Sequence, residues 1–381
     1  MKLRSIEPTP SPNAMKLNVD ETASTAKTYT ADQPEEAPEI IQRLLAVDGV
    51  KSVFRVADFL SVERDPKADW KEVLPMVREV FGEEAEPEDD TVSRKAEAPI
   101  EGFGEVQVQL QTFRGLPIQV KLTWDGEEKR VALPQRFVDA VMKAQEASPN
   151  MVMERRWEDR GVRFGNPDKI GEEMVEEISA AYDSDRLDRL VKQAFNQEPG
   201  EPVKEANRGL KVTLDMLDDP DWKKRYAALD QMHPTLEDLE VLAKALQDPK
   251  SSIRRLATAY LGSLEDPKVL PYLYQALKDP SVTVRRTAGD CLSDLGDPDA
   301  IGPMIEALKD KSKLVRWRAA MFLYETGDAS AVPALREAQD DPEFEVSMQV
   351  KMALERIEGG EEASGSVWQK MTRRNEGADP R

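Results

Sequence analysis

The sequence predicts a multidomain fold in which two small α+β domains precede an all-α solenoid of stacked helix pairs. One observation behind this prediction is a pattern that returns at a fixed interval between Asp219 and Ile357, as helical repeats do. The other is the alternation of apolar and polar residues before the repeats, which indicates strands. A length of 381 residues allows two or three domains. We expect an N-terminal domain at 1–82, an acidic linker at 83–99, a middle α+β domain with an antiparallel sheet at 100–181, a repeat array with a degenerate first repeat at 183–357 and a disordered tail at 358–381.

An aspartate marks the start of each repeat unit. It recurs at positions 219, 248, 279, 310 and 341, and proline follows it in four of these five places. An Asp-Pro pair predicts a helix start, because the carboxylate accepts hydrogen bonds from free backbone N–H groups and proline presets φ. Five further columns keep the same interval: Arg254, Arg285 and Arg316; Ala257, Ala288 and Ala319; Leu261, Leu292 and Leu323; Asp266, Asp297 and Asp328; Leu273, Met304 and Leu335.

Each unit is predicted to contain two helices. Between Val282 and Leu295, small and apolar residues fall three or four positions apart, which predicts one buried stripe on a helix. Gly296, Asp297 and Pro298 then predict a stop and a second start. One such helix pair is too small to bury its own apolar face, so we expect the pairs to stack into a solenoid.

Each of the first four repeat aspartates lies six residues before an arginine, whereas Asp341 precedes Ser347. This spacing resembles the HEAT repeat, in the short bacterial form first described in phycobilisome lyases. The resemblance implies that these charged side chains form a ladder between neighbouring repeats. A row of arginines that binds a ligand is the alternative. The residues concerned are Asp219 and Arg225, Asp248 and Arg254, Asp279 and Arg285, Asp310 and Arg316.

The acidic composition limits the partners of the chain. The formal net charge is −20, whereas a nucleic acid or an anionic membrane surface requires a basic field. We therefore expect neither nucleic acid nor membrane as a partner. The segment 154–160 mixes arginine with tryptophan, but its acidic neighbours favour a solvated, salt-bridged surface over base stacking. The sequence contains no apolar run that resembles a signal peptide or a membrane span, which predicts a cytoplasmic protein.

The sequence offers no motif for catalysis or for a metal site of fixed geometry; the dense carboxylates of the 83–99 linker could hold a divalent cation loosely, but a solvated tether is the favoured interpretation. Cys291 is the only cysteine, so one chain cannot build a disulfide or a cysteine-ligated metal cluster. It shares a repeat column with Tyr260 and Phe322, which indicates a core position rather than a reactive thiol. The only histidine, His233, precedes Pro234 at a helix start, where we expect a solvated turn rather than a catalytic base. We therefore expect no catalytic residue, no metal site, no cofactor and no enzymatic activity.

Residues 1–82 carry the pattern of a small α+β domain. Strands are predicted at 2–6 and 15–19, helices at 38–46 and 70–81, and a hairpin between 50–56 and 59–63. Four motifs occur in order along this segment: Pro8-Thr9-Pro10-Ser11-Pro12-Asn13-Ala14-Met15-Lys16-Leu17, Gly49-Val50-Lys51-Ser52-Val53-Phe54, Asp58-Phe59 and Asp69-Trp70. Together they resemble the N-terminal domain of the Nfu iron–sulfur scaffold family. The resemblance implies a docking or recognition module, because Nfu proteins hold their cluster on a separate domain with a Cys-X-X-Cys motif that this chain lacks.

The middle segment is predicted to contain a three-stranded antiparallel sheet. Apolar and polar residues alternate at 106–110 and 118–124, and Asp125-Gly126 is a hairpin turn before a third strand at 130–133. Helices are predicted at 134–147 and 170–181. Two more helices, at 183–195 and 202–217, are predicted to form the degenerate first repeat that caps the array.

The second helix of each repeat is expected to be exposed along one face of the array. Two of its rows carry aromatic and apolar residues where solvent-facing residues are expected, which indicates a protein-binding surface. Packing of Tyr274 and Ile305 against the next repeat is the alternative. The expected partner-binding residues are Tyr272, Tyr274, Ile305, Arg336, Lys278 and Lys309.

The order of the three segments resembles the conserved virulence factor C family of Gram-positive bacteria over the full length. The resemblance implies a regulatory or scaffolding role. Our main hypothesis is a non-enzymatic scaffold or adaptor that binds protein partners through the repeats. The alternative is an accessory factor in iron–sulfur cluster assembly, acting on assembly proteins through the N-terminal domain. A third hypothesis, a bilin or tetrapyrrole lyase, rests on the repeat type alone.

Overall fold

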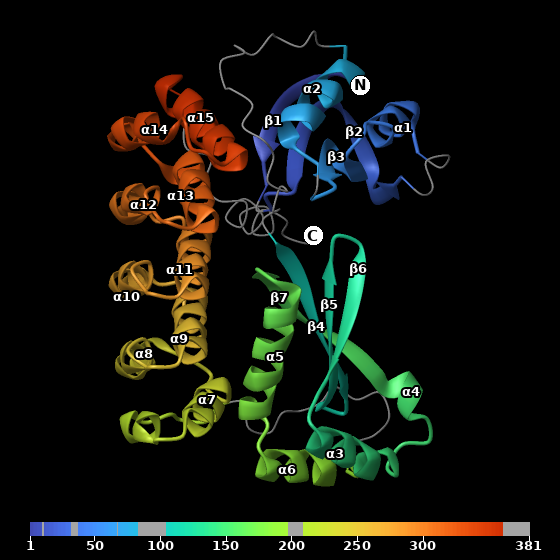
Figure 1. Ribbon diagram of the computed structural model, residues 1–381, viewed down its shortest axis with the longest axis vertical. Helices are drawn as coiled ribbons and strands as arrows, with labels where there is room; N and C mark the ends of the chain where they lie inside the picture. The colour runs from blue at the N-terminus through green and yellow to red at the C-terminus, as the bar shows by residue number, and fades with distance from the viewer. Residues whose placement is uncertain (10, 32–36, 67, 83–103, 197–208, 361–381) are drawn as a thin grey trace, which may run out of the picture. The chain divides into compact units, whose positions relative to one another are not determined.

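The computed structural model describes residues 1–381 except 10, 32–36, 67, 83–103, 197–208 and 361–381 (Figure 1). The described chain forms two compact units. The terminal unit comprises Met1–Phe103 together with Ile301–Arg381, and the central unit comprises Gly104–Ala300. The predicted acidic linker and most of the predicted tail fall outside the described residues. The predicted fold class, with two α+β domains and a HEAT-like helical array, is confirmed.

The N-terminal domain, in the terminal unit, is a three-stranded antiparallel sheet with two helices. Strands β1 (Leu3–Pro8), β2 (Ala14–Thr30) and β3 (Val50–Arg64) lie in that order, with α1 (Glu39–Leu45) and α2 (Trp70–Val80). The predicted hairpin between 50–56 and 59–63 is wrong. Both segments belong to β3, because β2 is long enough to pair with each of them in turn, and Ala57 lies at a register shift between them with φ of 46°.

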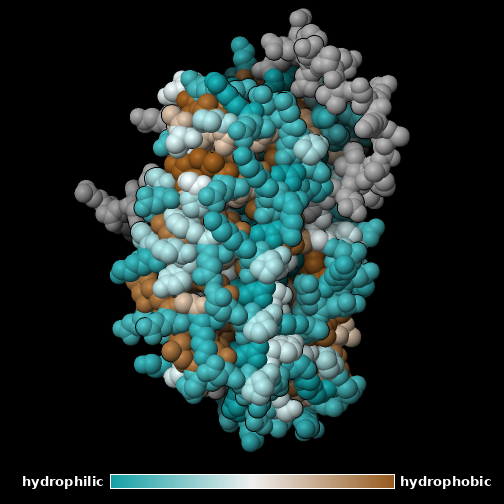
Figure 2. Space-filling view, turned by 60° about the vertical axis from the view of Figure 1, so that its left-hand side comes forward, coloured by the Kyte–Doolittle hydropathy of each residue, from teal (hydrophilic) through white to brown (hydrophobic). Residues whose placement is uncertain are grey.

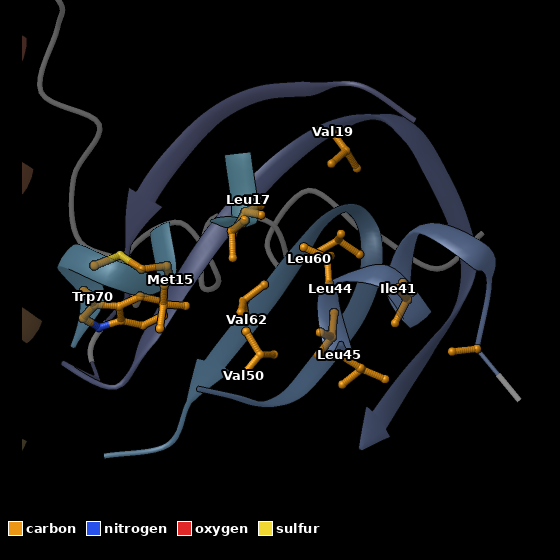
Figure 3. Close-up of a cluster of buried hydrophobic side chains, with 14 residues drawn as sticks. Met15, Leu17, Val19, Ile41, Leu44, Leu45, Val50, Leu60, Val62 and Trp70 are labelled. Atoms are coloured by element: carbon orange, nitrogen blue, oxygen red, sulfur yellow. The ribbon is translucent and has the colours of Figure 1, made fainter. Parts of the chain in front are cut away.

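The hydrophobic core of this domain contains side chains from both helices, α1 and α2, and from strands β2 and β3. Apolar residues at alternate positions of the strands point toward the helices, as expected for a sheet with one covered face. Trp70 is fully buried at one end of this cluster, next to Met15 (Figure 3). The cluster includes Met15, Leu17, Val19, Ile41, Leu44, Leu45, Val50, Val53, Leu60, Val62, Trp70, Val73 and Val77.

The middle domain, in the central unit, has four strands rather than the predicted three. Strands β4 (Glu105–Phe113), β5 (Leu116–Trp124), β6 (Glu127–Ala132) and β7 (Arg155–Phe164) lie in the order β6-β5-β4-β7. Strand β7 covers most of the segment that was predicted to be a salt-bridged surface. Its charged composition hid the strand, because it lies at an edge of the sheet, where charged residues are common. Four helices follow or interrupt the strands: α3 (Gln135–Gln145), α4 (Met151–Glu154), α5 (Pro167–Ala181) and α6 (Ser184–Ala194).

The repeats alternate a longer first helix with a shorter second helix. The central unit contains the first helices α7 (Trp222–Asp230), α9 (Ser251–Ser263) and α11 (Val282–Leu295) and the second helices α8 (Leu239–Ala245) and α10 (Leu270–Ala276). The terminal unit contains the first helices α13 (Lys313–Thr326) and α15 (Phe344–Glu358) and the second helices α12 (Ile301–Ala307) and α14 (Val332–Ala338). A short 3-10 turn precedes each second helix: η3 (Leu236–Asp238), η4 (Pro267–Val269), η5 (Pro298–Ala300) and η6 (Ala329–Ala331).

The prediction of a helix at 202–217 is wrong in the part that the structure describes. Residues 202–208 fall outside that part, and the only helical turn that follows is the 3-10 helix η2 (Leu214–Asp218). Gly209 has φ of 130° and Thr213 is extended, so neither residue continues an α-helix.

The repeat aspartates do not cap the first helices in the predicted way. Helix α11 has Ser281 as its N-cap residue, and Asp279 lies two residues earlier, accepting a 2.7 Å hydrogen bond from the Ser281 backbone N–H. Asp248 and Asp310 accept the corresponding bonds from Lys250 and Ser312. Because this bond uses Oδ1, the carboxylate still has Oδ2 and a further lone pair for another partner.

None of the described helices is long and apolar enough to cross a membrane.

Candidate functional site

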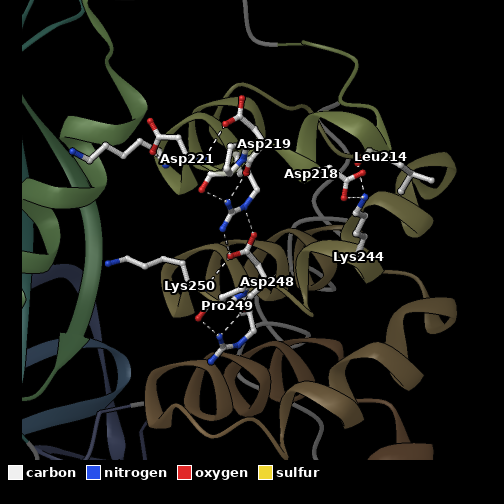
Figure 4. Close-up of polar contacts among 12 residues, drawn as sticks. Leu214, Asp218, Asp219, Asp221, Lys244, Asp248, Pro249 and Lys250 are labelled. Atoms are coloured by element: carbon white, nitrogen blue, oxygen red, sulfur yellow. Dashed lines mark hydrogen bonds and ion pairs between the residues drawn. The ribbon is translucent and has the colours of Figure 1, made fainter.

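The repeat aspartates and arginines meet between neighbouring repeats in the central unit (Figure 4). Arg225 of α7 donates from Nε to Asp248 Oδ2 at 2.6 Å and from Nη2 to Asp248 Oδ1 at 2.9 Å. Its third nitrogen, Nη1, donates to the carbonyl of Asp219 at 2.6 Å. The pair is buried, and the hydrogen bonds that Arg225 donates to Asp248 raise the pKa of Arg225 above its ordinary value. All three nitrogens of the Arg225 guanidinium therefore donate hydrogen bonds within the chain.

Two further pairs have the same geometry. Arg254 donates to both oxygens of Asp279 at 2.7 and 2.9 Å. In the terminal unit, Arg316 donates to both oxygens of Asp341 at 2.7 and 3.0 Å. Asp341 thus serves as the acceptor for the repeat before it, although Ser347 stands at the ladder position of its own repeat.

The predicted partner-binding residues are divided between the two units. In the central unit, Tyr272 and Tyr274 of α10 are half-buried, and Lys278 just beyond the helix is exposed. The hydroxyl of Tyr274 is buried without a hydrogen-bond partner. Burial raises the pKa of Tyr274, and Asp297 and Asp299, just before and within the turn η5 of the next repeat, add to the effect. Its hydroxyl end therefore lies near the next repeat.

The other three residues lie in the terminal unit. Ile305 of α12 is half-buried, whereas Lys309 and Arg336 are exposed. Lys309 pairs with Glu337 at 2.8 Å, and Arg336 pairs with Glu358 at 2.7 Å. A view turned toward the second helices shows hydrophobic residues in several separate patches surrounded by hydrophilic ones (Figure 2).

A buried ion triad joins the middle domain to a first helix of the repeats. Glu177 of α5 accepts hydrogen bonds from Arg163 of β7 and from Arg255 of α9, each at 3.0 Å. Burial alone would raise the pKa of Glu177, but the charges of Arg255 and Arg163 outweigh it and hold the pKa below its ordinary value. The carboxylate is therefore ionised at neutral pH and holds the two elements together.

Other contacts continue this junction within the central unit. The guanidinium of Arg286 on α11 lies 4.5 Å from the ring centre of Phe164 on β7, within cation–π distance. Lys250 pairs with Glu176 of α5 at 2.8 Å and lies 4.3 Å from the ring centre of Trp222. Helix α5 also packs against α7, so the middle domain contacts three consecutive first helices.

The N-terminal domain contacts another first helix, in the terminal unit. Arg64, the last residue of β3, is fully buried and donates from Nη2 to Glu345 Oε1 of α15 at 2.5 Å. Its Nη1 donates to the carbonyl of Ala68 at 2.9 Å, and its guanidinium lies 5.3 Å from the ring centre of Trp70. Both residues also hold the proline-rich motif: the backbone N–H of Arg64 donates to the Asn13 carbonyl, and Trp70 Nε1 donates to the Pro12 carbonyl, each at 2.9 Å.

Sequence reasoning did not find these two junctions. Arg64 and Glu345 are 281 residues apart, so no local pattern connects them. A signal was present for the other junction: Arg255 and Arg286 are separated by the repeat interval, and each directly follows a ladder arginine on the same helix. A second recurring arginine with no role in the ladder could have indicated a second charged contact.

The cysteine and the histidine occupy different environments. Cys291 on α11 is buried, and its Sγ lies 3.6 Å from the Thr258 carbonyl on α9. Burial, with a smaller contribution from Asp290 and Asp294, raises the pKa of this thiol well above its usual range. His233 is exposed. The described residues contain no group of three or more His, Cys, Asp or Glu placed to hold a metal ion.

Comparisons with known proteins match all three parts of the chain. The family model for the N terminus of the scaffold proteins Nfu and NifU matches residues 4–88, the virulence factor model matches 111–191, and HEAT repeats match 210–288 and 270–355. A crystal structure of the protein SAV1430 from Staphylococcus aureus is 43% identical, covers 21% of this chain and 99% of its own, and has a TM-score of 0.20.

Two relatives are similar over nearly the whole chain. The YpgR protein of Bacillus subtilis (strain 168) is 61% identical over 377 residues, which are 98% of each chain. The conserved virulence factor C of Staphylococcus aureus (strain MRSA252) is 48% identical over 378 residues, which are 98% of this chain and 100% of that one. With this identity over the full length, the chain belongs to the conserved virulence factor C family.

Proposed function

We propose that this protein is a non-enzymatic scaffold that binds a protein partner through the second helices of its HEAT-like repeats. The proposal rests on the different contacts of the first and the second helices of the repeats. Its own α+β domains contact first helices, through Glu177 and Arg255 in the central unit and through Arg64 and Glu345 in the terminal unit. Among the described second helices, α10 carries two aromatic residues, Tyr272 and Tyr274, and both are half-buried.

Tyr272 and Tyr274 have different parts in the proposed surface. A tyrosine at an interface contributes a large contact area with few rotatable bonds. The hydroxyl of Tyr274 is buried near Asp297 and Asp299, so a partner would meet mainly the ring of this residue. Tyr272 is then the main anchor on α10, with Lys278 just beyond the end of that helix. In the terminal unit, Ile305, Lys309 and Arg336 are proposed to bind a partner separately.

The test is affinity purification of the tagged full-length chain after mild cross-linking in a lysate of the source bacterium. We expect Tyr272→Ala to lose the specifically bound partner, and Tyr274→Phe, which removes only the buried hydroxyl, to retain it. Gln275→Ala changes an exposed residue on the same helix and is the matched control. Thermal unfolding must be the same for all variants. Undiminished recovery of the partner with Tyr272→Ala would exclude this surface.

A second candidate function rests on the match of residues 4–88 to the Nfu and NifU N-terminal model. In this function the N-terminal domain contacts an iron–sulfur assembly protein, and the chain itself holds no cluster. The test is anaerobic transfer of a cluster from a loaded scaffold protein to an apo-ferredoxin, with and without the full-length chain. An unchanged transfer rate, together with no co-elution of chain and scaffold, would contradict this function.

A further inference from the structure

The contact between Arg64 and α15 has the features of a binding site that is occupied by the chain's own helix. The guanidinium of Arg64 is fully buried in the N-terminal domain, whereas its acidic partner, Glu345, lies in the first turn of α15 in the last repeat. Glu345 is the second residue of α15, so its carboxylate also lies at the positive end of the helix dipole. The site therefore recognises an acidic residue at the start of a helix.

Arg64 is not fully satisfied by this contact. Its Nη2 donates to one oxygen of Glu345 and, at 3.4 Å, to Asn13 Oδ1, while Nε is buried without a hydrogen-bond partner. The ladder arginine Arg254 instead offers Nε and Nη2 together to the two oxygens of Asp279. A buried donor without an acceptor destabilises the contact, because it has lost its hydrogen bonds to water and gained none in return. A carboxylate that approached Arg64 with both oxygens would remove that destabilisation.

Apolar contacts complete the recognition. Phe344 and Met348, one turn apart on α15, are only partly buried and pack against the hydrophobic core of the N-terminal domain. Lys71 Nζ lies 5.1 Å from the ring centre of Phe344, within cation–π distance. The ligand pattern is thus an aromatic residue, a glutamate and, three residues later, a second apolar residue, all in the first turns of a helix.

We propose that the Arg64 site of the N-terminal domain is a docking pocket for such an acidic, aromatic helix start, and that α15 fills it in cis until a partner helix with the same pattern displaces it. The partner's carboxylate would engage both Nε and Nη2 of Arg64, which Glu345 does not. Because the N-terminal domain and α15 belong to one chain, α15 has a high effective concentration at the Arg64 site. A partner helix must therefore bind this site more tightly than α15 does in order to displace it. This inference holds whether or not the second helices bind a protein.

The experiment uses a fluorescein-labelled peptide with the sequence of residues 341–357 as the probe and the full-length chain as the receptor. In the variant Phe344→Ala with Glu345→Gln, the resident helix is weakened while the pocket itself is unchanged. We expect this variant to bind the peptide about 10-fold or more tighter than the wild-type chain does. A peptide with glutamine in place of the glutamate at 345 should bind the variant at least about 10-fold more weakly, because the charged hydrogen bond is lost.

Hydrogen exchange provides the second measurement and needs no peptide. Glu345→Gln in the full-length chain should speed exchange of the amides of Asn13 and Ala14 and of those at 346–348, whereas Glu355→Gln, on an exposed position of the same helix, should not. Equal peptide affinity for wild-type chain and variant, no binding to the variant, or exchange that is unchanged by Glu345→Gln would each overturn the proposal.

Discussion

Arg254 on α9 and Asp279 at the start of the next repeat are joined by two parallel hydrogen bonds, Nε to Oδ2 at 2.7 Å and Nη2 to Oδ1 at 2.9 Å. Asp279 Oδ1 also accepts the backbone N–H of Ser281. One aspartate therefore fixes both the entry into its own helix α11 and the distance to the preceding repeat. A planar guanidinium matches the two oxygens of a carboxylate, so the pair sets an orientation as well as a contact.

We predict that Asp279→Asn lowers the free energy of unfolding by about 3 kcal/mol, because it leaves the largely buried charge of Arg254 without its partner. Asparagine can still accept the Ser281 N–H, so the helix start is retained. Glu337→Gln is the control: it breaks the exposed pair with Lys309 and should change the free energy of unfolding little, because solvent screens this pair. Urea denaturation measures both, and equal small losses would contradict the structural role of the ladder.

A second prediction concerns pH and the buried triad. Removing the charge by Glu177→Gln leaves Arg163 and Arg255 buried together without a counter-charge, which should cost about 3–5 kcal/mol at neutral pH. The pKa of Glu177 in the folded chain is below its ordinary value of 4.5. Its stabilisation is therefore complete above about pH 4.5 and is lost as the pH falls through the folded value.

The expected signature is a difference in unfolding free energy between wild type and Glu177→Gln that is largest at neutral pH and shrinks in acid. Urea titrations from pH 7 to pH 3 measure it. Glu176→Gln is the matched control, because the adjacent Glu176 is largely exposed and pairs only with Lys250 among the described ion pairs. A difference that stays constant over the whole range would show that the charge of Glu177 does not hold the junction.

The repeat array could be predicted from the sequence because its contacts are local and periodic. The spacing of Asp279 and Arg254 follows from the repeat interval itself. Their contact between neighbouring repeats follows from the same interval. Strand β7 could not be predicted, because a charged edge strand lacks the alternation that marks a covered one. The Arg64 contact with Glu345 depends on the docking of one domain on a distant helix, and nothing in the neighbourhood of either residue encodes that docking.

The close approach of α9 and α11 leads to a third prediction. A Cβ atom at Gly262 would lie 2.3 Å from Sγ and 2.7 Å from Cβ of Cys291, so any larger residue forces the two helices apart. We expect Gly262→Ala to cost about 1–3 kcal/mol, although alanine alone favours a helix. In the double variant Gly262→Ala with Cys291→Ala, the sulfur atom is gone and the shorter of the two clashes is absent. The losses in unfolding free energy of the two single variants should therefore not sum to the loss of the double variant, with a difference of about 1 kcal/mol or more. Simple additivity would contradict the packing described.

The thiol of Cys291 should report on the separation of these helices. It is buried and its pKa is raised well above the usual range, so the reactive thiolate is scarce and shielded in the folded chain. We expect labelling by 5,5′-dithiobis(2-nitrobenzoate) at pH 8 to be very slow in buffer and to become rapid only in denaturant. Gly262→Ala should accelerate labelling under native conditions, because the added methyl group pushes α11 away from α9. Val282→Ala, an exposed change on the same helix as Cys291, is the control and should leave the rate unchanged. Fast labelling of the wild-type chain would mean that the first helices separate readily, and the Gly262 contact would then not be the close packing on which this prediction depends.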